Sequence, residues 1–243
     1  MKQGTLKFLL NASIDTLPTS AYLKSWKKSS SDLCKLFKRR ETKNHVLNGC
    51  KVSLDTGIFT WRHNCIVNYI VNSVDTKFTV FSDLPGHTAA GGGSIPPEIC
   101  VTAEKPDIVI LDNHKKQIHL FELTCPSEKY IDTRNTEKSN KFGHFLTDIT
   151  YWKCTVNCFE VSSKGFISTR NHTTLNTLYK CTKTGITKSQ FKSNMSPLSI
   201  TASHPIFLYR EEPTFLEPPF LMPPLVASTK SQTDLGYLQQ III

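Results

Sequence analysis

The sequence predicts a mixed α/β fold in which helices flank a sheet. Segments with the apolar periodicity of helices and of strands follow one another in the order helix, strand, strand, strand, helix, strand, helix. The chain has 243 residues and 39% hydrophobic residues, which suffices for one good-sized core with appendages. The sequence therefore predicts one mixed-sheet domain accompanied by smaller segments.

The N-terminal part is expected to stand apart from this domain. Residues 1–30 are basic and helix-like, and the Asp-Thr-Leu-Pro-Thr segment at 15–19 interrupts them because proline disfavours a continuous helix. Residues 31–58 are polar and carry cysteine and histidine. We treat them as a helical linker and a small Cys/His segment, followed by the main domain at 59–204.

The main domain is expected to begin with an amphipathic helix from Trp61 to Val74 and a strand from Phe78 to Phe81. Residues 85–97 then form a loop with glycines at 91–93. This loop is too long for a plain connector, so it is expected to be a flap that faces the substrate. Two apolar strands follow, one over 105–112 and one over 118–124.

A helix is predicted from Ile131 to Lys153. Its apolar residues recur at core-facing spacing, at Phe142, Phe145, Leu146 and Ile149. Arg134, Lys138 and Lys141 fall at i, i+4 and i+7 and form a basic stripe beside the apolar one.

The remaining elements are a strand over 154–163 and a helix over 171–183 with Asn171 or Thr173 as its cap. Residues 205–243 are rich in proline and poor in charge. This tail is expected to be largely unstructured.

Two acidic residues lie on the two central strands. If a short loop around His114 joins these strands, Asp107 falls opposite Glu122, and both carboxylates share one face of the sheet. Opposed positions have Cβ atoms roughly 4.5–5.5 Å apart, which lets two carboxylates share one metal ion. A slip of one residue would separate them. This arrangement, with a lysine nearby, is typical of metal-dependent phosphodiester cleavage.

Each of these residues also has an interpretation in which it has no catalytic role. A basic helix stripe is usually a solvated face, and two acids in a hairpin often only stay hydrated. Glu122 is different, because it lies between Phe121 and Leu123 in a strand that looks covered on both sides. A buried carboxylate needs a partner, and either Lys138 or Lys141 is a candidate.

Composition favours a polyanionic partner. Lys and Arg number 29 against 20 Asp and Glu, which gives a formal net charge of +9. No apolar run is long enough to cross a bilayer, and the N-terminus lacks the pattern of a signal peptide. The eight cysteines are scattered and are expected to be mostly reduced thiols. A nuclear or cytoplasmic protein, not a secreted one, is expected.

The element order, together with Lys105-Pro106-Asp107 and Glu122, resembles the PD-(D/E)xK restriction-like nuclease superfamily. In its usual form a lysine follows the second acid by two residues, and Thr124 stands there in this chain. A lysine that has moved to the following helix is a feature of one group, the non-LTR retrotransposon polyproteins with a restriction-like endonuclease. The chain resembles the C-terminal part of their reverse-transcriptase polyprotein over about residues 7–209, with further matches in segments 9–19, 45–50 and 62–64.

This resemblance implies several residue roles. Asp107 and Glu122 would hold Mg²⁺ or Mn²⁺, Lys138 or Lys141 would stabilise charge, and a metal-bound water would be the nucleophile. The Arg-His-Asn motif of the family matches Arg62, His63 and Asn64, which would contact DNA together with Arg134 of the basic stripe. The alternative for the motif is a first helical turn whose polar groups serve only as caps.

The Cys/His segment departs from the family pattern. The spacing Cys-x2-Cys-x7-His-x4-Cys falls here on Cys34, Phe37, His45 and Cys50, and phenylalanine cannot bind zinc. A structural zinc site normally closes with four protein ligands, so a weakened or lost site is favoured over a functional one. Cys65 would substitute only if the fold brought it near.

The parent polyproteins nick chromosomal DNA and prime reverse transcription from the freed 3′ hydroxyl. This chain has no polymerase region, so the resemblance implies a fragment that binds and nicks DNA, with element RNA as a partner only through the missing part. The alternative is an inert DNA-binding remnant of a decayed element. A generic protein-interaction domain is a third interpretation, and the oligomeric state is not predicted.

Overall fold

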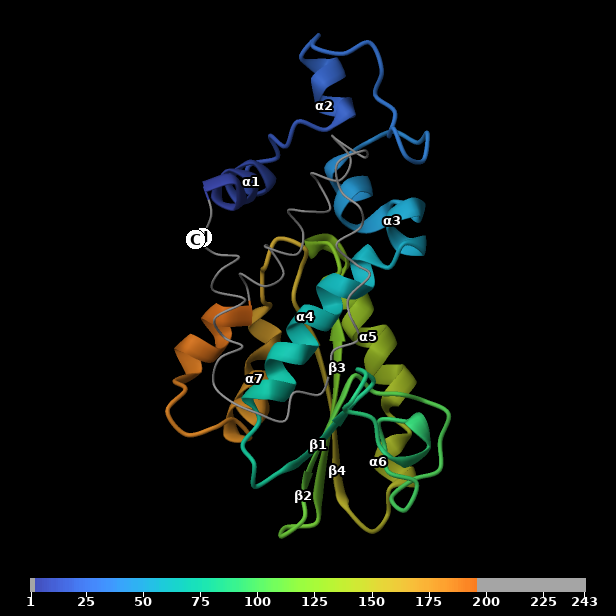
Figure 1. Ribbon diagram of the computed structural model, residues 1–243, viewed down its shortest axis with the longest axis vertical. Coiled ribbons are helices and arrows are strands. Elements are labelled where there is room, and N and C mark those ends of the chain that lie inside the picture. Colours follow the sequence, from blue (N-terminus) through green and yellow to red (C-terminus); the bar gives the residue numbers. More distant parts are fainter. Residues whose placement is uncertain (1–2, 196–243) are drawn as a thin grey trace. The chain divides into compact units, whose positions relative to one another are not determined.

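A computed structural model describes residues 3–195 (Figure 1). Their contacts divide them into two compact units, residues 3–58 and residues 59–195. The expected unstructured tail at 205–243 lies outside the described residues.

The first unit contains the predicted helical linker and the Cys/His segment. Helices α1 (Gln3–Ser13) and α2 (Ser20–Ser25) are separated at residues 14–19, as the proline predicted. The short π-helix η1 (His45–Gly49) leads into α3 (Lys51–Asp55). A small core joins the linker to this segment and consists of Phe8, Ala12, Leu17, Val46 and Leu47.

The second unit is a four-stranded mixed sheet with helices on both faces. Its elements are α4 (Ile58–Ser73), β1 (Thr79–Ser82), β2 (Ile108–Asp112), β3 (Gln117–Thr124), α5 (Ile131–Phe142), α6 (Phe145–Asp148), β4 (Lys153–Glu160) and α7 (His172–Lys180). The strand order is β1-β2-β3-β4. β2 runs antiparallel to both β1 and β3, while β4 runs parallel to β3 after the α5–α6 crossover.

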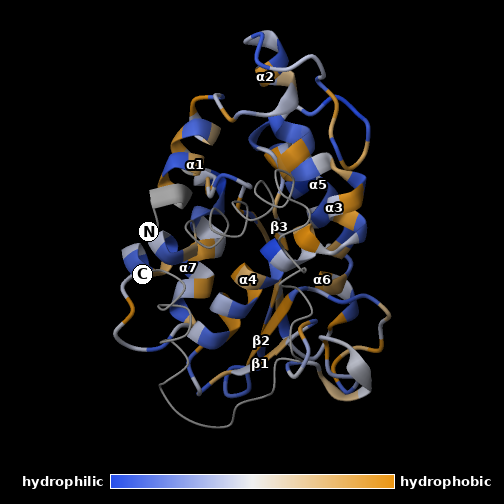
Figure 2. Cartoon of the chain, turned by 45° about the horizontal axis from the view of Figure 1, so that its top comes forward, coloured by the Kyte–Doolittle hydropathy of each residue, from blue (hydrophilic) through white to orange (hydrophobic). Residues whose placement is uncertain are grey.

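Alternation along the strands divides the core into two clusters. Residues Ile108, Ile110 and Phe121 face α4 and α7, where they pack with Ile66 and Leu178. On the opposite face Val109, Leu111, Ile118 and Leu120 pack with Phe142 of α5 and Phe145 of α6. Every residue of β2 and the inner residues of β3 are buried, so the central strands are covered on both sides, as predicted. Figure 2 shows the hydropathy of these strands and of the helices around them.

The helix predicted over 131–153 is wrong in its extent. α5 ends at Phe142, and α6 covers only Phe145–Asp148 before the chain leaves helical geometry at Ile149. In the connecting turn Leu146 N–H bonds to Gly143 O over three residues instead of four, at 3.2 Å. This turn keeps Phe145 and Ile149 in the core but leaves Leu146 55% exposed, so Leu146 does not face the core as expected.

The long loop of residues 85–97 is anchored to the domain. Its short 3₁₀ turn, η2 (Ala90–Gly92), contains Gly91 and Gly92 at φ of 81° and 78°, a region that glycine adopts without steric cost. Ile95 is 4% exposed and joins the α5-side core cluster. The loop is therefore pinned at Ile95, and its role as a flap stays a prediction.

Two smaller connections complete the unit. The turns η3 (Glu128–Tyr130) and η4 (Thr169–Asn171) precede α5 and α7. Asn171 is the N-cap residue of α7, as predicted, but its side chain does not cap the helix and bonds instead to the Glu160 carbonyl.

Candidate functional site

The two predicted acids lie side by side at one end of the central hairpin. Val109 pairs with Leu120 and Leu111 with Ile118, which confirms the predicted register. Asp107 precedes β2 by one residue, and its N–H donates to Glu122 Oε2 at 3.3 Å. Asp107 Oδ2 in turn accepts from Leu123 N–H at 2.7 Å. Main-chain donors therefore fix both carboxylates on the face that packs against α5.

α5 supplies the cation beside this pair. Lys138 Nζ forms a short ion pair with Glu122 Oε1. Asn135, Lys138 and Phe142 occur at i, i+3 and i+7, so one face of α5 meets first the polar end and then the apolar end of the sheet. Lys141 is exposed and lies over the Phe142 ring at 4.6 Å. Of the two candidate lysines, the fold thus places Lys138 at the acids.

The Arg-His-Asn segment of α4 turns two of its side chains inward. His63 Nε2 lies 3.1 Å from Asp107 Oδ2, and its Nδ1 lies 3.1 Å from Asn64 Oδ1. The Arg62 side chain donates to the Cys125 carbonyl at 3.0 Å, stacks over Phe59, and is 2% exposed. His63 therefore connects α4 to Asp107 at the start of β2, and Arg62 connects α4 to Cys125 just after β3.

The fourth residue assigned to DNA contact, Arg134, is exposed on α5 and pairs with Glu137 at 2.6 Å. It lies one residue before Asn135, on the solvent side of the helix. Arg134 and Asn64 stay predictions as DNA contacts.

The pKa values of Glu122 and His63 are both raised at this site, for different reasons. Burial, followed by the charge of Asp107, raises the pKa of Glu122, while the bond to Lys138 opposes the shift. Burial alone would lower the pKa of His63, but its hydrogen bond and ion pair with Asp107 outweigh burial and raise this pKa to about 9. Protonated His63 and Lys138 thus compensate the two acids.

Sequence reasoning missed a third acidic residue. Ser82 of β1 pairs with Ile108, so Asp83 stands one step further, beside Asp107. Partial desolvation, together with the Asp107 charge, raises the pKa of Asp83. An acidic residue directly after a strand was the available signal, but only the pairing of β1 with β2 shows which neighbour it meets.

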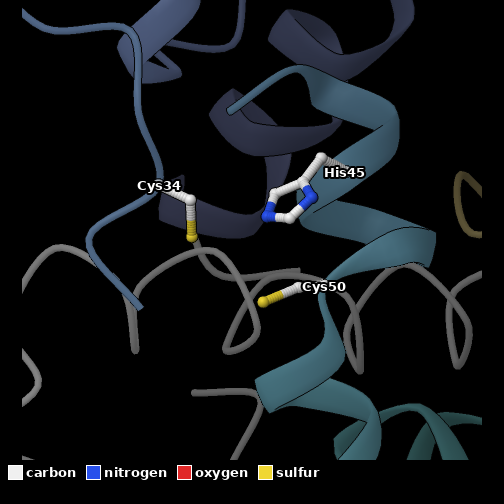
Figure 3. Close-up of side chains that lie close together, drawn as sticks. All are labelled: Cys34, His45 and Cys50. Carbon is white, nitrogen blue, oxygen red and sulfur yellow. The ribbon is translucent and has the colours of Figure 1, made fainter. Parts of the chain in front are cut away.

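The Cys/His segment gathers three donors (Figure 3). Cys34, His45 and Cys50 are all buried, and their ligand atoms lie within 4.8 Å of one another. A small hairpin presents Cys34: Leu33 bridges to Arg40, and Cys34 N–H donates to Arg39 O at 2.7 Å. Zinc takes sulfur at ~2.3 Å and imidazole nitrogen at ~2.0–2.1 Å, so the three donors fit one ion.

Phe37 stands where the fourth ligand was expected. Its ring stacks on His45 with centroids 6.4 Å apart and planes 9° apart, and Arg39 lies over it at 5.4 Å. The side chain therefore fills its position by packing and supplies no donor. Cys65 belongs to the other unit of the chain and is not among the three clustered residues.

No known protein family matches the chain, and no curated protein matches its sequence. Within residues 3–195, no helix has the length and apolarity needed to span a bilayer.

Replacing Phe37 by cysteine should complete the zinc site. We expect Phe37→Cys to bind Zn²⁺ more tightly than the wild type by more than about tenfold, because structural sites close with four ligands. Competition with a chromophoric chelator measures this affinity. Phe37→Leu removes the ring without adding a donor and should give no gain. Equal affinities for the Cys and Leu variants would place residue 37 away from the metal.

The raised pKa of His63 predicts a pH-dependent stability. The folded state holds this proton more tightly than the unfolded state, so the stabilisation is complete below the ordinary pKa of 6.5 and is lost as pH rises through about 9. We expect Tm to fall across this window more steeply in the wild type than in His63→Gln. The control His114→Gln, in the exposed β2–β3 turn, should keep the wild-type slope. Parallel slopes for wild type and His63→Gln would contradict the assignment.

Proposed function

We propose that the chain is a Mg²⁺-dependent DNA endonuclease of the restriction-like type, derived from the C-terminal region of a non-LTR retrotransposon polyprotein. The observation that carries the proposal is the contact of Asp107, Glu122 and Lys138 around one end of the sheet. The order of a helix, three antiparallel strands, a helix and a parallel strand supports it. The net charge of +9 suits a polyanionic substrate.

The donor set fits magnesium. Asp107 and Glu122 offer carboxylate oxygens, and Mg²⁺ is bound in proteins by one or two carboxylates plus substrate phosphate oxygens and water. When bound, the ion would supply an activated water and a Lewis acid for the phosphoryl oxygen. Mn²⁺ takes the same class of ligands.

The protein groups have distinct tasks in this proposal. The N–H groups of Asp107 and Leu123 hold the carboxylates in place, and His63 fixes Asp107 Oδ2. Lys138 neutralises Glu122 in the metal-free protein. Once a divalent cation compensates Glu122, the ammonium group is available to bind a phosphoryl oxygen and to stabilise the charge that develops there.

In the parent polyprotein such a nick would prime reverse transcription on the target DNA, which requires access to the nucleus and to element RNA held by the remaining polyprotein. For the isolated chain, the proposed activity is limited to binding and nicking DNA.

A nicking assay on supercoiled plasmid with Mg²⁺ tests the proposal. We expect Asp107→Ala to lose at least about a hundredfold in rate, because it removes a metal ligand. The matched control is Asp112→Asn, a change at the opposite end of β2, where the carboxylate pairs with Lys115 at 3.2 Å. The control should nick at the wild-type rate. Equal nicking by Asp107→Ala and the wild type would eliminate the catalytic assignment.

The two lysines of α5 give a second, sharper comparison. Lys138→Ala should abolish nicking and Lys141→Ala should retain most of it, because only Lys138 contacts the acids. Rates measured at saturating DNA separate catalysis from binding. The opposite ranking would overturn the choice of Lys138. Salt-sensitive retention of DNA without any cleavage by the wild type would instead identify an inert DNA-binding remnant.

A further inference from the structure

Among residues 3–195, Asn64 forms no hydrogen bond with an acidic side chain, but it bonds to a residue that does. It lies on α4, which begins at Ile58, so it stands beyond the first turn and its side chain is not placed to cap the helix. The side chain is half-buried, and its Oδ1 lies 3.1 Å from His63 Nδ1. Consecutive residues on a helix normally point in different directions. The contact between these two neighbours is therefore a specific arrangement of their side chains.

The His63 ring joins Asn64 to Asp107. Nδ1–H of the ring donates to the amide oxygen of Asn64, and Nε2–H donates to Asp107 Oδ2, each over 3.1 Å. Amide and carboxylate oxygens are acceptors, so each ring nitrogen directs a hydrogen at its partner. A ring that is bonded at both nitrogens cannot turn about its side-chain bonds without breaking one of the two hydrogen bonds. Asn64 therefore fixes the direction in which His63 donates to Asp107.

The bond from His63 falls on the same Asp107 oxygen as a main-chain bond. Oδ2 accepts from Leu123 N–H at 2.7 Å as well as from His63. Oδ1 of Asp107 accepts no hydrogen bond from the residues that the structure describes. The two donors thus set the plane of the carboxylate and leave Oδ1 as the oxygen for a metal ion.

We propose that Asn64 is a positioning residue of the metal site: it holds the His63 ring, which holds Asp107 Oδ2, so that Oδ1 is presented to the divalent cation. This role rests on the proposed nuclease function. It differs from the DNA contact that the resemblance implies for Asn64. A DNA contact does not require the bond to His63, because phosphate accepts from the amide nitrogen and leaves the amide oxygen without a task.

Proton NMR of the imidazole N–H groups tests the arrangement in the metal-free chain. The Nε2–H of His63, identified by its loss in His63→Gln, should give a sharp downfield signal because it is hydrogen-bonded to a carboxylate. Asn64→Ala should broaden or remove this signal, since the ring is then free to turn. Asn64→Asp keeps an acceptor oxygen and should restore the signal. An unchanged signal in Asn64→Ala would overturn the proposal.

Calorimetric titration of the whole chain with Mn²⁺ measures the consequence for the metal. We expect Asn64→Ala to weaken Mn²⁺ binding by about tenfold, because loss of a group that orients a metal ligand typically costs ~10–100-fold in affinity. The matched control is Asn68→Ala, one turn further along α4, where Asn68 Oδ1 accepts from Asn72 at 3.1 Å. The control should bind Mn²⁺ as the wild type does. Equal Mn²⁺ affinities of Asn64→Ala and the wild type would refute the positioning role.

DNA retention separates this role from a phosphate contact. Asn64→Asp places a negative charge at the position, so a phosphate contact would weaken DNA binding by about tenfold or more, whereas positioning predicts binding within about twofold of the wild type. Weaker DNA binding by Asn64→Asp and Asn64→Ala with unchanged Mn²⁺ affinity would assign Asn64 to DNA. A wild type that binds Mn²⁺ but leaves plasmid uncut would refute the nuclease, and the Mn²⁺ comparison would still decide the role of Asn64. A wild type that binds no Mn²⁺ would overturn both.

Discussion

The candidate site depends on how the protein compensates the negative charge of two buried carboxylates. Asp107 and Glu122 are 7% and 5% exposed, and each would destabilise the fold if it stood alone. Main-chain N–H groups of the same hairpin bond to both carboxylates, and Lys138 and His63 supply positive charge from helices on opposite faces of the sheet. The same compensation that permits burial also preorganises the carboxylates. In the proposed nuclease, a divalent cation would replace part of this positive charge without a large movement of the carboxylates.

The division of α5 into a polar and an apolar end explains how a packed core and a charged pocket share one face of the sheet. Phe142 and Phe145 pack on Leu120 and its neighbours, and Lys138 and Asn135 follow toward the N-terminus of α5, opposite Glu122 and Glu160. Because parallel β3 and β4 end together, polar residues at their last positions gather beneath the start of this helix.

The Cys/His segment brings three possible metal donors together although phenylalanine stands at the position where a fourth ligand was expected. The hairpin that presents Cys34 and the π-turn that carries His45 bring three donors together, although Phe37 supplies none. Stacking of Phe37 on His45 and of Arg39 on Phe37 fills the position by contact. The hydrophobic residues that join this segment to the linker helix, Leu17 and Val46 among them, add stability that does not depend on metal.

The sequence by itself determined the element order, the interruption of the N-terminal helix before Pro18, and the register that sets Asp107 opposite Glu122, because local propensity and strand parity are properties of neighbouring residues. It left the choice between Lys138 and Lys141 open, since helical spacing puts both on one stripe and only packing of α5 on β3 and β4 selects one. It extended one helix through Leu146, because apolar spacing cannot reveal the turn at Gly143 that brings β4 alongside β3. The contact of His63 with Asp107 and the place of Asp83 were decided by tertiary structure alone, since each joins segments that no local pattern relates.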